Sequence, residues 1–229
     1  MTLVLAHRGA TGSWPENTLA AFAEARRLGA DGVELDVRRS ADGALVVHHD
    51  AAVPGVGPVS SARVRDLPEH VPLLGDALAA CDGMVVNVEL KNEGVDALAA
   101  EAAATVVELG WASRVVVSCF DPDCLVAVRR AEPALPLGWL LGPGADAAAL
   151  LDEAVERGFE GVHPFVASVD AALVDGARRS GLALRTWTVN SDGDLRAMVD
   201  LGVDAVITDR PAAALAVARG GPNGGAAPG

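Results

Sequence analysis

Eight short apolar runs alternate with eight longer stretches rich in alanine and leucine along this chain of 229 residues. The predicted strands are residues 3–6, 32–37, 84–90, 114–120, 137–141, 161–165, 183–189 and 204–208, and the predicted helices are residues 16–28, 74–80, 95–109, 122–131, 145–157, 170–180, 192–201 and 211–219. Continuous apolar strands that alternate with helices are typical of a parallel sheet buried on both faces. Eight such units predict an α/β fold with a single domain over residues 1–219, a closed (β/α)8 TIM barrel. A doubly wound open sheet is the structural alternative, although no G-x-G-x-x-G motif follows the first strand.

One interval interrupts the alternation between the second strand and the next helix. Residues 44–47 form a short extended piece, and residues 51–72 beyond it are rich in proline and glycine. We therefore predict a short insertion after the second strand. In a barrel such a segment lies at the carboxyl ends of the strands, where active sites are built. The C-terminal residues 220–229 (GGPNGGAAPG) are of low complexity and are predicted to be disordered.

Composition narrows the possible partners and the location. The net charge of -13 argues against nucleic acid and anionic membrane surfaces, because both select for basic patches. No apolar run reaches the ~18–20 residues of a membrane span, and the polar HRG at residues 7–9 precedes any signal-peptide core. Three cysteines without metal-binding spacing are typical of free thiols in a reducing compartment. We therefore predict a cytoplasmic protein without stable membrane insertion, and the sequence does not indicate its oligomeric state.

Acidic residues stand inside two of the predicted apolar strands. Glu34 and Asp36 are separated by one residue, so they share a face of their strand, and Glu89 lies on the next long strand. Carboxylates in apolar strands are costly unless they are paired or bound to a metal. One hard divalent cation, Mg²⁺ or Ca²⁺, explains all three, because such ions prefer oxygen ligands, and zinc fits less well. The alternative is salt bridging to nearby cations, namely Arg38, Arg39 or Lys91.

Two histidines and two cations end strands near these acids. His7 and Arg8 follow the first strand, and His49 closes the extended piece after the second. Lys91, the only lysine among the 18 lysine and arginine residues, ends the strand that carries Glu89. Imidazoles act as general acids and bases near neutral pH, while a metal and two cations can hold an anion. The set predicts a site for a phosphate ester, in which one histidine activates the attacking hydroxyl and the other protonates the leaving alkoxide.

Aromatic residues at strand ends are candidates for the walls of the substrate pocket. Trp187 on the seventh strand fits either a pocket wall or the hydrophobic core. Phe120 and Trp139, on the fourth and fifth strands, are further wall candidates, and His163 on the sixth is a candidate for supporting the catalytic groups.

Two polar segments are typical of helix N-termini. Residues 15–18 (PENT) place proline, acid and amide groups at the start of the first helix, although Glu16 or Asn17 could also orient residues 7–8. The pair Thr208-Asp209 follows the last strand and predicts a cap for the last helix.

These motifs, in this order, resemble those of the glycerophosphodiester phosphodiesterase family. The similarity is carried by AHRG (6–9), PENT (15–18), GADGVELDVRRSADGALVVHHD (29–50), VPLLGDAL (71–78), VNVELK (86–91), WTVN (187–190) and GVDAVITDRP (202–211). HRG, E-L-D with a following H-D, and E-x-K in register are together highly specific. The resemblance implies a (β/α)8 barrel that uses a divalent metal, commonly Mg²⁺ or Ca²⁺. It also implies hydrolysis of glycerophosphodiesters, such as glycerophosphocholine, to sn-glycerol 3-phosphate and an alcohol.

Carried over by position, the resemblance implies roles for individual residues. The two catalytic histidines of the family fall on His7 and His49, and His49 is singled out because Asp50 follows it directly. The implied metal ligands are Glu34, Asp36 and Glu89, and the implied phosphate contacts are Arg8 and Lys91. The resemblance further implies attack on phosphorus by the glycerol hydroxyl of the substrate, which gives a cyclic intermediate that water opens. Which histidine is the base and which the acid stays open.

The substrate class stays open as well. The segment 51–73 is shorter than is common in the family, and a compact, open mouth could admit bulkier head groups. A lysophospholipase D-like phosphodiesterase is therefore the first alternative. The second is a non-catalytic barrel that binds phosphodiesters or metal, although no implied histidine or acid is lost. A carbonyl lyase with Lys91 as Schiff-base former fits the acids and histidines poorly.

Overall fold

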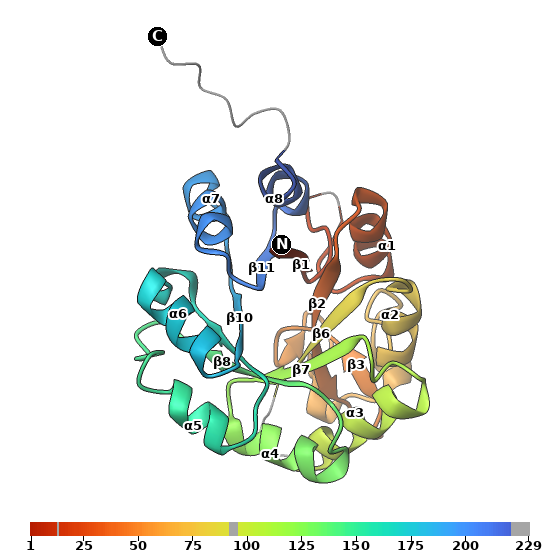
Figure 1. Cartoon of the computed structure of the whole chain (residues 1–229). Helices are drawn as coiled ribbons and strands as arrows, with labels where there is room; N and C mark the ends of the chain where they lie inside the picture. Colours follow the sequence, from red (N-terminus) through yellow and green to blue (C-terminus); the bar gives the residue numbers. More distant parts are fainter. Residues whose placement is uncertain (13, 92–95, 221–229) are drawn as a thin grey trace.

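Eight parallel strands close into a barrel in the computed structural model, which describes residues 1–12, 14–91 and 96–220 (Figure 1). Around the ring the order is β1 (Leu3–His7), β2 (Gly32–Arg39), β6 (Val85–Leu90), β7 (Val115–Cys119), β8 (Leu137–Leu141), β9 (Gly161–Pro164), β10 (Ala183–Thr186) and β11 (Ala205–Thr208). Strand β1 pairs in parallel with both β2 and β11, so these eight strands leave no open edge. The predicted TIM barrel is confirmed, and the open doubly wound sheet is excluded.

The helices surround this barrel on its outer side (Figure 1). The described residues form α1 (Leu19–Leu28), α2 (Leu74–Ala80), α3 (Asp96–Glu108), α4 (Pro122–Ala131), α5 (Leu151–Glu156), α6 (Ala171–Arg179), α7 (Asp192–Leu201) and α8 (Pro211–Ala218). Their apolar faces share one large core with strand residues such as Val33, Leu35 and Val37, all fully buried. The strands are continuously apolar because one set of side chains meets the helices while the other set faces the barrel interior.

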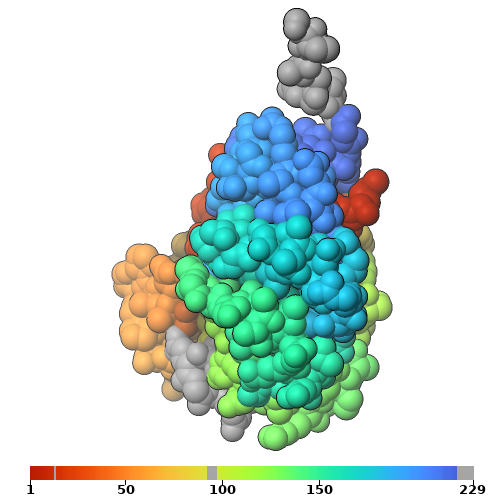
Figure 2. Space-filling model, turned by 60° about the vertical axis from the view of Figure 1, so that its left-hand side comes forward, coloured from red at the N-terminus to blue at the C-terminus, as the bar shows by residue number. Residues whose placement is uncertain are grey.

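The chain between β2 and α2 forms a small annex on the barrel. It contains β3 (Leu45–Val47), β4 (Ala52–Val53), β5 (Gly57–Pro58) and two 3-10 turns, Val59–Ser61 and Val64–Asp66. Strand β3 pairs antiparallel with β2, and β4 pairs antiparallel with β5. Val46, Val53 and Val59 give the annex a hydrophobic cluster of its own. Figure 2 shows this part in orange, standing out from the side of the barrel. The predicted short insertion after the second strand is confirmed.

Two helices begin later than the sequence pattern predicts. Helix α1 begins after Thr18, whose hydroxyl accepts the backbone N–H of Ala21, while Asn17 has the left-handed φ of 57° and lies outside the helix. Helix α5 lacks the first turns of the predicted segment, and there the Asp146 carboxylate accepts the backbone N–H of Ala149 at 3.2 Å. Thr18 caps α1, because its hydroxyl satisfies a backbone N–H that lacks a partner within the helix. Asp146 instead bonds to a backbone N–H in the turn before α5, which favours the turn over another helical turn.

Three further expectations concern the cysteines, the membrane and the chain ends. Cys81, Cys119 and Cys124 are buried and are not joined in a disulfide, and burial raises the pKa of Cys81 to about 12. Within the described part of the chain, no helix has the length and apolar character needed to cross a membrane. The domain boundary at residue 219 and the cytoplasmic location stay predictions. The predicted disordered tail lies, apart from Gly220, outside the described residues.

Candidate active site

Three carboxylates from β2 and β6 converge near the carboxyl ends of these strands. The two strands pair so that Asp36 lies opposite Glu89 and Glu34 lies opposite Asn87. Oxygen atoms of Glu34, Asp36 and Glu89 lie within 4.8 Å of one another, and none of the three residues is more than 8% exposed. Side chains at alternate positions share one side of a strand, so the E-L-D spacing itself creates this cluster. The structure therefore brings the predicted ligand set together.

Burial and neighbouring charges give the three acids different proton affinities. Burial, together with the charges of Asp36 and Glu89, holds the pKa of Glu34 well above its usual value. Burial beside Asp36 also raises the pKa of Glu89. Burial alone would raise the pKa of Asp36, but Lys91 and Arg8 outweigh it and lower that pKa. One carboxylate is thus kept ionised, while negative charge on the other two is disfavoured by the protein alone.

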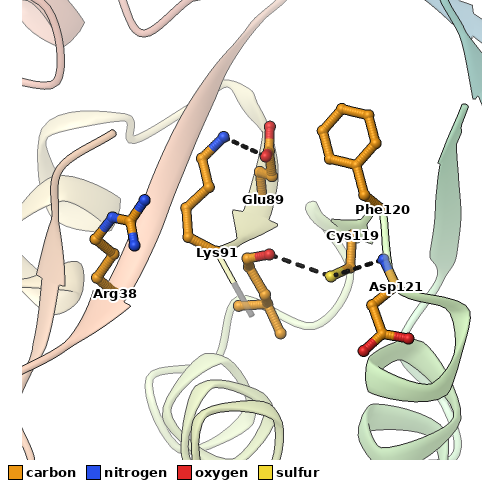
Figure 3. Close-up of a pocket in the computed structure, with 7 residues that line it drawn as sticks. Arg38, Glu89, Lys91, Cys119, Phe120 and Asp121 are labelled. Carbon is orange, nitrogen blue, oxygen red and sulfur yellow. Dashed lines mark hydrogen bonds and ion pairs between the residues drawn. The ribbon is translucent and has the colours of Figure 1, made fainter. Parts of the chain in front are cut away.

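Lys91 and Arg8 reach the acids from neighbouring strand ends. The Lys91 Nζ lies 2.9 Å from Asp36 Oδ1 and also contacts the Glu89 carboxylate (Figure 3). The Arg8 Nε lies 3.1 Å from Asp36 Oδ2, and its Nη1 lies 2.9 Å from Glu16 Oε2. Glu16 therefore orients Arg8, which is one of the two interpretations of the PENT segment. Both cations stand beside the acids with donors that a bound anion could share.

The salt-bridge alternative accounts for only part of the acid cluster. Of the three cations considered for it, Lys91 joins the acids. Arg39 pairs with Glu101 at 2.6 Å, on the outer side of the barrel toward α3. The Arg38 Nε donates to the backbone carbonyl of His49 at 2.9 Å and so holds the chain that carries this histidine.

The acid cluster fits a divalent cation. Three carboxylates face two cationic side chains, Lys91 and Arg8, so the balance of formal charge is negative. Among the described residues, the buried Glu34 Oε1 has no hydrogen-bond partner. A hard cation such as Mg²⁺ or Ca²⁺ takes oxygen ligands and would supply both the missing charge and the missing partner.

The His7-Arg8-Gly9 turn explains why this motif needs its glycine. Arg8 adopts the left-handed φ of 55°, and its backbone N–H donates to Glu34 Oε2 at 3.1 Å. Gly9 has a φ of 88°, and a Cβ at this position would lie 2.7 Å from the Cβ of Ala21. Only glycine allows the turn to pack this closely against α1.

The imidazole of His7 lies between two carboxylates, that of Asp209 at Nδ1 and that of Glu34 at Nε2. Its Nδ1 lies 2.7 Å from Asp209 Oδ1, and its Nε2 lies 3.9 Å from Glu34 Oε2. Asn190 Nδ2 donates to the second oxygen of Asp209 at 2.6 Å. The hydrogen bond from His7 is the main reason that the pKa of Asp209 is lowered. Because the carboxylate accepts the proton of Nδ1, Nε2 is the atom left to face the site.

Asp209 contacts the candidate site directly, which the sequence interpretation missed. Asp209 does not cap the last helix as predicted: α8 begins at Pro211 after Arg210, which has no side-chain cap bond, and Asp209 bonds to His7 instead. Thr208 accepts the backbone N–H of Arg210 at 3.0 Å, just before the helix. A signal was present, since Asp209 directly follows the last barrel strand, where functional groups gather.

His49 enters the site from the chain that follows β3. Its Nδ1 lies 2.8 Å from Asp50 Oδ1, so both imidazoles are bonded to a carboxylate at the same ring atom. Burial lowers the pKa of His49 more than the charges of Asp36 and Asp50 raise it, which favours the neutral ring. The adjacent His48 is bonded elsewhere, with its Nε2 3.3 Å from the Ala52 carbonyl oxygen.

A cavity of about 150 Å³ lies among these groups. Its lining residues are His7, Arg8, Glu34, His49, Asn87, Glu89, Lys91, Phe120, Leu140, Trp187, Thr188 and Ile207. A second cavity of about 220 Å³ shares Glu89, Lys91 and Phe120 with the first (Figure 3). The site therefore has room on both sides of the Lys91 ammonium.

Trp187 and Phe120 form an apolar wall of the first cavity. The Trp187 ring meets those of Phe120 and Phe165 edge to face, with centroids 5.5 Å apart in each pair, and Phe120 is 45% exposed. The wall prediction for Trp139 is wrong, because this residue is buried in the main core and packs on Phe159.

His163 lies within the barrel packing rather than at the cavity. It is fully buried, and a Cβ at Gly138 would lie 2.2 Å from its Nε2. The same ring atom lies 3.4 Å from Arg185 Nη1, and burial holds the pKa of His163 well below its usual value. Its backbone carbonyl accepts the Trp187 indole N–H at 2.8 Å, and its backbone pairs with Leu140 of the cavity wall. The expected supporting role of the imidazole is therefore not realised.

The chain is similar to known glycerophosphodiester phosphodiesterases in both sequence and fold. Residues 7–213 match the glycerophosphoryl diester phosphodiesterase family. A glycerophosphodiester phosphodiesterase of Caldanaerobacter subterraneus subsp. tengcongensis is 34% identical over 96% of this chain and 99% of its own length.

Two solved structures extend the similarity to the arrangement of the whole barrel. One, a glycerophosphodiester phosphodiesterase from Agrobacterium tumefaciens, has a TM-score of 0.83 at 27% identity and covers 96% of this chain and 100% of its own. A phosphodiesterase of Oleispira antarctica, solved with the product sn-glycerol-3-phosphate, has a TM-score of 0.83 at 25% identity and covers 95% of this chain and 96% of its own. The chain therefore belongs to the glycerophosphoryl diester phosphodiesterase family and is an enzyme of that class.

Proposed function

We propose that the enzyme hydrolyses glycerophosphodiesters, such as glycerophosphocholine, to sn-glycerol 3-phosphate and an alcohol, with one bound Mg²⁺ or Ca²⁺ and two catalytic histidines. The observation that carries this proposal is the buried cluster of three carboxylates beside two imidazoles. The relative from Oleispira antarctica binds sn-glycerol 3-phosphate as product, which supports the same product here.

The phosphate group binds, in this proposal, where the cations meet the acids. Glu34, Asp36 and Glu89 would hold the divalent ion, which would supply positive charge to offset the charge that develops on the phosphoryl oxygens. Arg8 and Lys91 donate to the same anion from the sides. Arg8 offers a planar fork of donors, whereas Lys91 offers a compact charge between the two cavities.

The two imidazoles move the protons. One of them takes a proton from the attacking glycerol hydroxyl of the substrate, and the other gives a proton to the leaving alkoxide, so a cyclic glycerol phosphate forms as the alcohol leaves. Water then opens this ring: one imidazole takes a proton from the water and the other gives a proton to the ring oxygen that leaves phosphorus, which yields sn-glycerol 3-phosphate. The carboxylates of Asp209 and Asp50 fix each ring through Nδ1, which leaves Nε2 for the transfer. The neutral form favoured at His49 suits the role of a base, while the division of roles between His7 and His49 stays open.

The remaining interpretations concern the alcohol and the partners. Trp187 and Phe120 offer an apolar surface for part of the substrate. The partner is a small-molecule phosphodiester, and the strongly negative net charge supports the prediction that nucleic acid is not bound.

Hydrolysis of glycerophosphocholine tests this proposal. We expect purified enzyme to release choline and glycerol 3-phosphate in equal amounts, to stop in EDTA, and to recover when Mg²⁺ or Ca²⁺ is restored. Release of phosphocholine and glycerol, or an undiminished rate in EDTA, would contradict it. The same assay on lysophosphatidylcholine distinguishes the lysophospholipase D-like alternative, which predicts a higher kcat/KM on the lipid.

A further inference from the structure

Asn87 belongs to the cavity although no expectation assigned it a role. It lies on β6 two residues before Glu89, so both side chains project from the same side of the strand. In the strand pairing it stands opposite Glu34. Asn87 is 1% exposed, and it lines the same cavity as Glu34, Glu89 and the two histidines. A polar side chain is thus enclosed next to the acid cluster.

The amide of Asn87 is anchored at one end and unpaired at the other. Its Nδ2 donates to the hydroxyl of Ser118, a fully buried residue on the adjacent strand β7, at 2.9 Å. Among the described residues, the Asn87 Oδ1 has no hydrogen-bond partner, and neither has the Glu34 Oε1 across the strand pair. Buried polar atoms are nearly always satisfied, because an unpaired acceptor loses its bonds to water.

Two acceptors cannot satisfy each other while Glu34 is ionised, so both then need a donor or a cation. We propose that Asn87 Oδ1 is a fourth oxygen ligand of the divalent ion held by Glu34, Asp36 and Glu89. This inference rests on the cation of the proposed function. Amide carbonyl oxygens are regular ligands of hard cations.

A neutral ligand suits the charge balance of this site. The three carboxylates already repel one another, as the raised pKa values of Glu34 and Glu89 indicate. An amide oxygen adds coordination without adding negative charge. Ser118 has a positioning role, because its hydroxyl holds the amide nitrogen and thereby turns the carbonyl toward the ion.

Calorimetric titration with Mg²⁺ or Ca²⁺ alone, without substrate, tests the assignment. Asn87→Ala is expected to weaken binding by about 10- to 100-fold, the range reported for loss of groups that support a metal site. Asn87→Asp keeps an oxygen in place and is expected to bind at least as tightly as the wild type. Ser118→Ala, which removes only the anchor, is expected to weaken binding by a smaller factor. Thr186→Val is the matched control, because its hydroxyl is equally buried but bonds to the Pro164 carbonyl, and it should bind like the wild type.

The outcomes separate this inference from the proposed function. No binding by the wild type would overturn both. Wild-type binding with equal affinity in Asn87→Ala would overturn only the role of Asn87. If Asn87→Asp bound more weakly than Asn87→Ala, the amide nitrogen rather than the oxygen would face Glu34, and the inference would fail. Where Asn87→Ala does not fold, Ser118→Ala decides, since wild-type affinity in that variant would show that the amide is not held for the ion.

Discussion

Replacement of His7 or His49 by alanine is expected to lower kcat on glycerophosphocholine by about 10²- to 10⁴-fold, the usual contribution of a general acid or base. Each imidazole lines the cavity beside the acids and is bonded through Nδ1 to a carboxylate, Asp209 for His7 and Asp50 for His49. That bond fixes which ring nitrogen faces the substrate, and alanine removes the proton carrier. Steady-state kinetics on purified variants, together with thermal unfolding, measures the effect and shows that the barrel is intact.

His48→Ala is the matched control for the His49 variant. His48 is the adjacent imidazole in the same turn, but it bonds to the Ala52 carbonyl and does not line the cavity. We expect its kcat to stay close to that of the wild type. A His49 variant that turned over substrate as fast as the His48 variant would remove His49 from the mechanism, and the same comparison applies to His7.

Neutralisation of an acidic ligand is the second large expected effect. Glu34→Gln and Glu89→Gln should each weaken Mg²⁺ or Ca²⁺ binding by about 100-fold or more, beyond what loss of a merely supporting group costs. Glutamine keeps the shape of the side chain but removes one of the three charges that face the ion. Burial and the charges of Asp36 and Glu89 raise the pKa of Glu34, so its negative charge is unfavourable when no metal is bound. The neutral glutamine of Glu34→Gln should therefore relieve the repulsion among the acids in the metal-free protein. We therefore expect the metal-free Glu34→Gln protein to unfold at an equal or higher temperature than the wild type, whereas the added cation should raise its Tm less.

Glu101→Gln controls for the same chemical change at the outer side of the barrel, where Glu101 pairs with Arg39. Its affinity for the cation should match that of the wild type. If all acid-to-amide variants titrated alike, the three carboxylates would not be the ligands. Asp36 is less suitable for this test, because its removal would leave Arg8 and Lys91 without their shared partner. Breaking such a buried ion pair lowers the free energy of unfolding by about 3–5 kcal/mol. A loss of metal binding in an Asp36 variant could therefore reflect partial unfolding rather than a missing ligand.

The barrel was predictable because its signals are local. Each strand is a continuous apolar run, and each acid sits at a fixed spacing within such a run, so Glu34 and Asp36 share a face whatever the rest of the chain does. Register between β2 and β6 then brings Glu89 beside them. The strand ends of a parallel barrel meet at one rim, which is why His7, His49 and Lys91 could be placed near the acids from sequence alone.

The residues that were missed depend on contacts between distant parts of the chain. Asp209 reaches His7 over 202 positions, only because β11 closes the barrel against β1. The sequence pattern indicated that Asn17 belongs to the start of a helix. In the structure it is buried, has a positive φ that places it outside α1, and donates to Asp36 Oδ2 at 2.7 Å. In the sequence, Asn87 has no feature that separates it from other strand residues. The direction of its amide group is visible only in the structure, from its hydrogen bond to Ser118. Such roles follow from side-chain orientation, which sequence patterns do not contain.

Glu34, Asp36 and Glu89 are expected to hold one divalent ion between the imidazoles of His7 and His49. Anomalous diffraction from a crystal soaked with Mn²⁺, a stand-in for Mg²⁺, tests it most directly. One strong anomalous peak is expected, at about 2.0–2.6 Å from oxygen atoms of all three carboxylates, the range over which hard divalent cations bind oxygen ligands. A peak elsewhere, or none in fully soaked crystals while Lys91 still bridges Asp36 and Glu89, would contradict it.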